Sequence, residues 1–279
     1  MNSTVQTDNH RTHTAGVLDQ DTPGARATIS LTYVLMLSAS ILLFLPIDTV
    51  AWLGQEDGPI ENAGAFLFLL GGTTCFVTAY RSSELHRLCG TKHTESPLAL
   101  YALGTLLLVC FGEEISWGQR LFDYPVPAWL AANNRQGEWN LHNLAWFHAQ
   151  TAEGAEKSFW GRLINTERLL ACFQLLLCTL VPMFTAFSAT FTTWVTRIGL
   201  PVVPWWIAGL MPVHFVVSQA LYATVGDQLI LGDTLDEAKE TVRAIIFLVV
   251  AIWTYTRTTR ARMPERAHGC SMRPDHYST

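Results

Sequence analysis

The sequence predicts an all-α membrane protein, a bundle of about six transmembrane helices, on the basis of its composition and the distribution of its charges. Charged residues make up only 15% of the 279 residues, against about 25% in soluble proteins. The shortage is concentrated in long segments, because residues 27–45 and 169–195 carry no charge and residues 60–80 carry only Glu61. A helix needs roughly 20 apolar residues to cross a bilayer core, so these segments are predicted membrane spans. This pattern argues against a soluble enzyme, and a net charge of −5 offers no basic surface for nucleic acid.

Six spans are predicted in the membrane domain, residues 27–256, with approximate bounds of 27–46, 60–80, 97–122, 169–190, 199–224 and 236–256. A polar tail, 1–26, precedes the first span, and a basic tail, 257–279, follows the last. The first span is not expected to be a cleavable signal peptide, because it follows a long polar tail. The connection 123–167 contains several tryptophans, so we expect it to be partly helical and to lie at the membrane interface.

The distribution of Lys and Arg predicts that both termini are cytoplasmic, because most basic residues then lie in short inner segments. Most acidic residues fall on the outer side in this orientation. All six cysteines lie in predicted spans or on the inner side, and none is in a CxxC motif. A metal site on the outer face would therefore have to use carboxylate and imidazole ligands.

The strongest candidate for chemistry is the pair Glu113 and Glu114, near the outer end of the third predicted span. A helix that begins at Pro97 carries them about 24 Å along its axis. Ionisable residues at that depth usually have a functional role. If the helix continues to residue 122, Glu113 and Arg120 share a face and form a structural ion pair. One arginine does not readily neutralise two glutamates, so Glu114 is the catalytic candidate.

Two further segments carry candidate side chains for the same site. Asp57 precedes Pro59 and is a predicted N-cap. Glu61 follows in the first turn, where the helix dipole favours an anion, at about the level of Glu114. In the block 134–144, Glu138 and His142 are four residues apart. On a helix they would share a face, where they could hold one metal ion or orient an imidazole for general-base catalysis.

The last two predicted spans add weaker candidates. Thr234 and Glu237 form the pattern of a capping box at the start of the sixth span. Glu240 lies one turn deeper and can pair with Arg243. His214 lies in the middle of the fifth span, and deep histidines are rare enough to be candidates for function.

The sequence thus predicts an outward-facing carboxylate–imidazole centre covered by the block 134–144. Its catalytic residues, which are also the ligands of a divalent metal if one binds, are predicted to be Glu61, Glu114, Glu138 and His142. Supporting roles fall to Trp117, Asn140, Asn143, Glu240 and His214. No P-loop, GxGxxG, GxSxG or HExxH motif occurs in a suitable context, so no nucleotide, haem or flavin cofactor is predicted.

The strings GEEISWGQRLF (112–122) and NRQGEWNLHNL (134–144), with EDGPIENA (56–63) before them, resemble signature blocks of a family of bacterial integral membrane proteins. That family is defined by motif rather than by activity, and the resemblance covers roughly residues 50–145. It implies a prokaryotic inner membrane and singles out Glu113, Glu114, Trp117, Arg120, Glu138, His142 and Asn143.

Two other families are similar more loosely. CAAX-protease-like glutamate intramembrane proteases also have paired glutamates, but their arginine follows the second glutamate by four residues, whereas Arg120 follows Glu114 by six. Alkaline-ceramidase-like hydrolases combine intramembrane acidic residues with histidines, but their C-terminal HxxxH is absent here.

These features favour a hydrolase-like membrane enzyme, with or without a divalent metal, that acts on a lipid or another lipophilic substrate. Membrane lipids are the expected partners, and the sequence identifies no protein partner. A proton- or cation-coupled carrier or channel is the first alternative, since intramembrane carboxylates suit it equally. A structural or assembly subunit of a larger membrane complex is the second, because it would have the same hydropathy.

Overall fold

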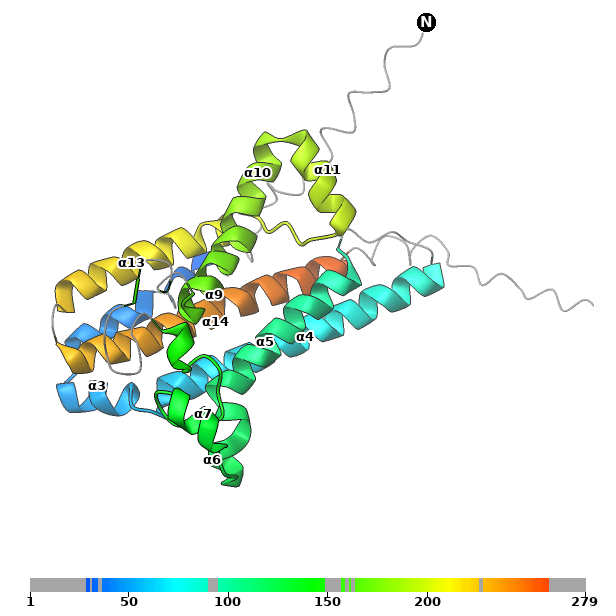
Figure 1. The fold of residues 1–279 in the computed structure, drawn as a ribbon. Coiled ribbons are helices and arrows are strands. Elements are labelled where there is room, and N and C mark those ends of the chain that lie inside the picture. The colour runs from blue at the N-terminus through cyan, green and yellow to red at the C-terminus, as the bar shows by residue number, and fades with distance from the viewer. Residues whose placement is uncertain are drawn as a thin grey trace, which may run out of the picture.

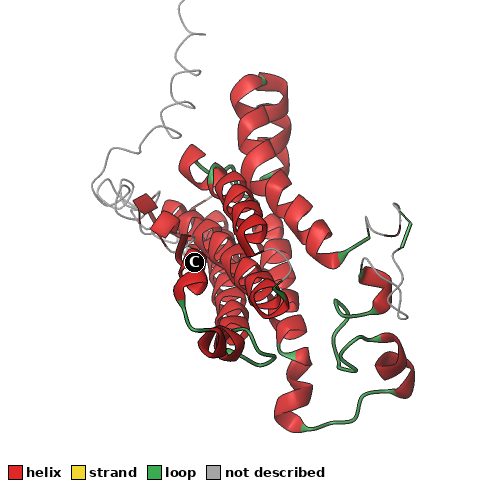
Figure 2. Cartoon of the chain, turned by 90° about the vertical axis from the view of Figure 1, so that its left-hand side faces the viewer, coloured by secondary structure: helices red, strands yellow, loops and turns green. Residues whose placement is uncertain are grey.

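The computed structural model describes residues 29–30, 32–34, 37–89, 95–148, 157–158, 161, 164–225 and 228–260. Every regular element within these ranges is a helix, and Figure 2 draws only helices and loops there. The predicted all-α class is therefore confirmed for the described chain. The predicted N-terminal tail and most of the predicted C-terminal tail lie outside the described residues.

Three long helices form the centre of the bundle. α4 (Pro59–Cys89) packs against both α5 (Pro97–Glu114) and α14 (Leu229–Arg260), and the three run side by side in Figure 1. α13 (Leu210–Val225), preceded by the short α12 (Trp205–Ala208), lies along α14.

Shorter elements surround this centre. The 3₁₀ helix η1 (Ser38–Phe44) and α3 (Ile47–Leu53) contact α14. α9 (Thr166–Leu175) continues through a π-helical turn, η4 (Leu176–Leu180), into α10 (Val181–Phe187). In Figure 1, α10 and α11 (Ala189–Ile198) form a bent hairpin that projects from the bundle. Four short described elements lie between α5 and α9: η2 (Ser116–Gly118), α6 (Gln119–Phe122), α7 (Ala128–Asn133) and η3 (Ala145–Phe147).

The packing of α4 against α5 depends on small residues. A Cβ atom added to Gly104 would lie 2.6 Å from the ring of Phe76, and one added to Gly72 would lie 2.9 Å from the Leu108 side chain. Small residues at such positions allow helix backbones to approach closely, which is typical of membrane helices. On the other side of α4, Phe68 packs against Phe247 of α14 with ring centroids 6.4 Å apart, inside the main buried cluster.

Four described helices are long and apolar enough to cross a membrane: Pro59–Glu84, Pro97–Glu114, Thr166–Phe187 and Trp205–Val225. The chain is therefore a multi-pass membrane protein. These helices correspond to the second to fifth predicted spans, and the predicted spans 27–46 and 236–256 are not among them. Residues 236–256 lie inside α14, whose first half carries many charged residues.

Candidate functional site

The regular α-helix of α5 ends at Glu114. Ser116, Trp117 and Gly118 have φ angles of 46°, 53° and 82°, in the left-handed region that cannot continue a right-handed helix. The predicted helix to residue 122 is therefore wrong. Because the regular helical spacing stops at Glu114, Glu113 and Arg120 do not share a face, and the predicted Glu113–Arg120 ion pair is not formed.

Arg120 instead joins three separate segments of the chain. Its guanidinium lies 2.9 Å from Asp57 Oδ1 and 3.0 Å from Glu61 Oε1, both at the start of α4, and 3.3 Å from Glu138 Oε1. It also donates a 3.0 Å hydrogen bond to the backbone oxygen of Glu114. Glu61, Glu138 and Arg120 are largely buried, with side-chain exposures of 14%, 13% and 19%. Glu61 and Glu138 are thus predicted catalytic residues whose charges are compensated by an arginine.

The start of α4 differs from its predicted cap. The Asp57 side chain binds Arg120, while its backbone N–H donates to Glu61 Oε2 at 2.7 Å. Asp57 itself has a φ of 60° and is therefore strained. Glu56 lies 4.0 Å from Arg120. Burial and the Glu138 carboxylate raise the pKa of Glu56, and the guanidinium of Arg120 opposes them.

The block 134–144 folds back onto the end of α5 as a closed loop, not as a helix. A β-bridge joins Asn134 to Leu144, and the Asn134 side chain donates to the Asn140 carbonyl at 2.8 Å. Glu138 and His142 therefore do not share a helix face as predicted. Asn143 stabilises the loop from within, because its side chain donates to that of Gln136.

Glu138 contacts the segment that follows α5. It accepts hydrogen bonds from Ser116 Oγ and, at 3.1 Å, from Asn140 Nδ2. Asn140 also donates to Ser116 Oγ at 3.1 Å. These side chains attach the loop to the strained backbone at Ser116.

His142 pairs with Glu113. Glu113 Oε2 accepts backbone N–H groups from Leu141 at 2.6 Å and His142 at 2.8 Å, and Oε1 accepts the Trp117 indole N–H at 2.7 Å. The Nδ1 atom of His142 lies 3.4 Å from the same Oε2, and its side chain is 30% exposed. Because three hydrogen bonds hold Glu113 in place, its carboxylate fixes the orientation of the His142 imidazole. Nδ1 faces the carboxylate, and Nε2 has no hydrogen bond within the described chain.

Glu114 takes part in this network only through its backbone oxygen, which accepts from Arg120. Among the described residues its carboxylate makes no hydrogen bond or ion pair. It lies close enough to Glu240, Glu237 and Glu61 for their negative charges to repel it. The predicted capping box at Glu237 is wrong, because α14 begins five residues before Thr234, at Leu229, and the Thr234 hydroxyl donates to Val50 and Ile230 carbonyls.

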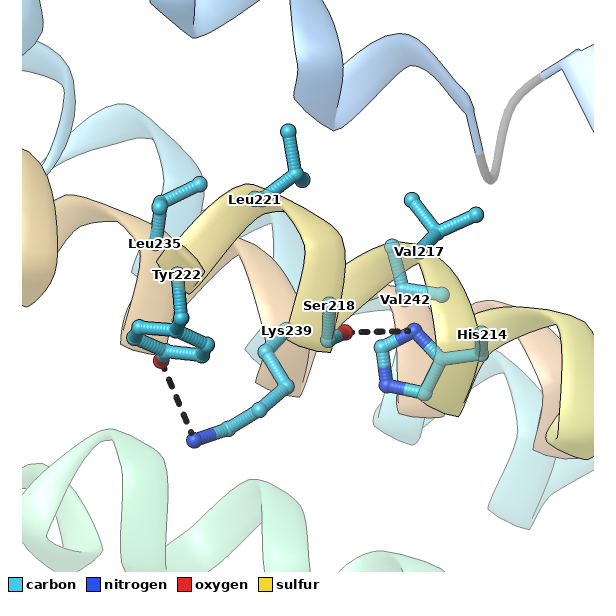
Figure 3. A pocket seen from close by; sticks show the side chains of 8 residues that line it. All are labelled: His214, Val217, Ser218, Leu221, Tyr222, Leu235, Lys239 and Val242. Atoms are coloured by element: carbon cyan, nitrogen blue, oxygen red, sulfur yellow. Dashed lines mark hydrogen bonds between the residues drawn. The ribbon is translucent and has the colours of Figure 1, made fainter. Parts of the chain in front are cut away.

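A second group of polar side chains lies between α13 and α14, where the predicted candidate His214 is 5% exposed. Figure 3 shows the imidazole of His214 beside Ser218 and Lys239 extending toward Tyr222. His214 Nδ1 and Ser218 Oγ are 3.4 Å apart. The cavity that these residues line has a volume of about 10 Å³, which is room for one water molecule. Among the described residues, His214 therefore makes no contact with the loop site.

Sequence reasoning missed two polar residues that border this group. Gln174, in a segment that is uncharged throughout, is completely buried and donates to the Arg243 backbone oxygen at 3.0 Å. Glu167 lies 3.1 Å from Lys239 and 3.8 Å from Arg243. Arg243 therefore pairs with Glu167, and the predicted pair with Glu240 is not formed in the described chain. A search for uncharged polar residues within the spans would have found Gln174.

The described residues contain no group of three His, Cys, Asp or Glu side chains that could hold a metal ion. The four predicted ligands are divided instead: Glu61 and Glu138 bind Arg120, His142 binds Glu113, and Glu114 stands apart. The chemistry that the site can perform without further groups is proton transfer by His142, positioned by Glu113.

Comparison with protein-family models, with curated proteins and with solved structures found no match for this chain.

Proposed function

We propose that this membrane protein is a hydrolase-like enzyme that acts on a lipid or another lipophilic substrate, with His142 as its general base. The observation that carries the proposal is the contact between His142 Nδ1 and Glu113 Oε2 at 3.4 Å, beside an imidazole that is 30% exposed. A carboxylate at Nδ1 favours the tautomer with its proton on that nitrogen and leaves the lone pair on Nε2. A base that is oriented by a third group in this way is a recurring arrangement in hydrolytic enzymes.

In the proposed reaction, Nε2 of His142 takes a proton from a water molecule as the water oxygen attacks a carbonyl or phosphoryl group. The imidazolium is stabilised by Glu113 and returns the proton to the leaving group. Arg120 is a positioning residue, because it attaches the loop that carries His142 to the start of α4 through Glu138 and Glu61.

The test is product formation by the purified protein in vesicles of phosphatidylethanolamine and phosphatidylglycerol, followed by mass spectrometry of the lipids. His142→Gln should abolish a product that the unaltered protein forms. The matched control is His148→Gln in the same loop, where burial and then Arg135 lower the pKa of the imidazole. A product that persists in His142→Gln, or no product from the unaltered protein, would contradict the proposal for these lipids.

A second candidate function, a proton- or cation-coupled carrier, is favoured by Glu114. Its carboxylate has no hydrogen bond within the described residues and faces Glu237 and Glu240, as expected of a group that binds and releases a cation. Proton or sodium flux into vesicles that contain the protein, lost in Glu114→Gln and retained in His142→Gln, would support the carrier over the enzyme.

We further propose that the site opens on the extracytoplasmic side of a prokaryotic inner membrane, in a topology of six spans. The basic residues of the loops support this orientation. In a cysteine-free background, a membrane-impermeant maleimide should label Arg135→Cys, which is exposed, in intact cells and should label Arg87→Cys only after lysis. The opposite pattern would place the site in the cytoplasm.

A further inference from the structure

An apolar pocket lies directly beside the Glu113–His142 pair. It has a volume of about 410 Å³ and is lined by Trp117, Tyr124, Leu130, Trp139 and Leu141. This volume falls within the range of roughly 300–1,000 Å³ that is usual for small-molecule sites. Two of its lining residues contact the proposed catalytic pair, because Trp117 and Leu141 both donate N–H groups to Glu113.

The pocket is apolar although three of its five side chains have a polar group. The Tyr124 hydroxyl donates to the Trp117 backbone oxygen at 2.9 Å, and the Trp139 indole N–H donates to the Pro125 oxygen at 3.1 Å. With these groups satisfied, the aromatic rings are left as hydrocarbon walls. Tyr124 and Trp139 meet edge to face at 6.2 Å, and Leu130 is 1% exposed. Such walls favour an apolar occupant and offer no hydrogen bond to a polar one.

The surface around the pocket continues this apolar character. Four large apolar side chains on the same segment are more than 60% exposed: Leu121, Phe122, Trp129 and Trp146. Aromatic residues at this density outside the end of a transmembrane helix are typical of the membrane interface. Exposing so much apolar surface to water would be unfavourable, at about 25 cal/mol per Å². These side chains are therefore suited to the lipid phase, whose most abundant apolar groups are acyl chains.

We infer that this pocket binds one acyl chain of a membrane phospholipid. With the chain between Trp117 and Leu141, the polar end of the lipid lies at the loop that carries His142. The role of this lipid as a substrate rests on the proposed function, whereas binding of the chain does not. The inferred substrate class is a phospholipid whose hydrolysable bond lies at the polar end of the bound chain.

The probe is a phosphatidylglycerol that carries a photoreactive diazirine in the middle of one acyl chain, added to vesicles that contain the full-length protein. Crosslinks mapped by mass spectrometry should include the residues that line the pocket. Leu141→Trp should lower their labelling about tenfold, which corresponds to about 1.4 kcal/mol, because the larger side chain takes up part of the pocket. Leu141 is 53% exposed and its backbone N–H to Glu113 is retained, so this variant is expected to fold.

The matched control is Leu121→Trp, which adds the same side chain at a neighbouring position that is 75% exposed and outside the pocket. It should leave labelling of the pocket unchanged. Labelling restricted to the membrane-spanning helices, or equal labelling of the pocket in both variants, would overturn the inference. Labelling that Leu141→Trp removes, without a product that depends on His142, would retain the acyl-chain site and reject the proposed enzyme.

Discussion

Replacement of Arg120 by methionine should detach the loop 134–144 from the start of α4. The substitution leaves Glu61 and Glu138 largely buried, at 14% and 13% exposure, without their common cation. Breaking a buried ion pair by removing one partner costs about 3–5 kcal/mol. Asp57 is 58% exposed, and an exposed pair contributes at most about 1 kcal/mol.

We take about 3 kcal/mol as the expected loss, because both buried carboxylates retain some contact with solvent. At about 2–4 °C per kcal/mol, the Tm in detergent should fall by about 6–12 °C. Protease digestion under native conditions should cut the loop first. The matched control is Arg87→Met, because Arg87 is 71% exposed and pairs only with Glu84, at 3.3 Å, among the described residues. Its Tm should change by less than about 2 °C, since an exposed pair of this kind contributes about 0.3–0.5 kcal/mol.

The reasoning further requires that the penalty come from uncompensated carboxylates. Combining Arg120→Met with Glu61→Gln and Glu138→Gln should therefore recover most of the lost stability, because neutral amides remove the buried charges. If Arg120→Met is as mild as Arg87→Met, or if the two glutamines add further destabilisation, the assigned role of Arg120 is wrong.

Two further predictions concern the residues around Glu113. Glu113→Gln should cost about 1.5–3 kcal/mol, because it weakens charge-assisted hydrogen bonds, while Glu114→Gln should not lower stability, because it removes a carboxylate that Glu237 and Glu240 repel; equal thermal stabilities of the two variants would contradict this. Gly112→Ala should place a Cβ atom 2.9 Å from the Trp117 ring and cost about 1–3 kcal/mol. The control Gly232→Ala, with open space around it, should gain about 0.5–1 kcal/mol, and a harmless Gly112→Ala would show that the ring is not held there.

The membrane helices could be predicted because hydropathy depends on local composition. The apolar runs that include residues 60–80 and 97–114 need no knowledge of their neighbours to be recognised, since the bilayer acts on each helix separately. α14 was harder to interpret, because charges in its first half contact other elements: Lys239 pairs with Glu167 of α9. Whether such a helix crosses the membrane depends on what compensates those charges.

The candidate residues were also found from the sequence, but their partners were not. Glu113, Arg120, Glu138 and His142 all take part in the contacts at the end of α5. The expected pairing of Glu113 with Arg120 and the expected shared face of Glu138 and His142 both assumed continuous helix. That assumption follows from local periodicity, and it failed in both segments.

By itself the sequence determined the all-helical membrane class, four of the apolar helices and the residue types that gather at the site. Only the tertiary structure decided which carboxylates pair with Arg120 and which one orients His142. The physical reason lies in Ser116 and Trp117, whose left-handed φ angles are unfavourable by about 1–3 kcal/mol each and are not predicted by local propensity. The local bond from Trp117 to Glu113 and the long-range bond from Ser116 to Glu138 offset that strain. The long-range bond exists only once the chain has folded.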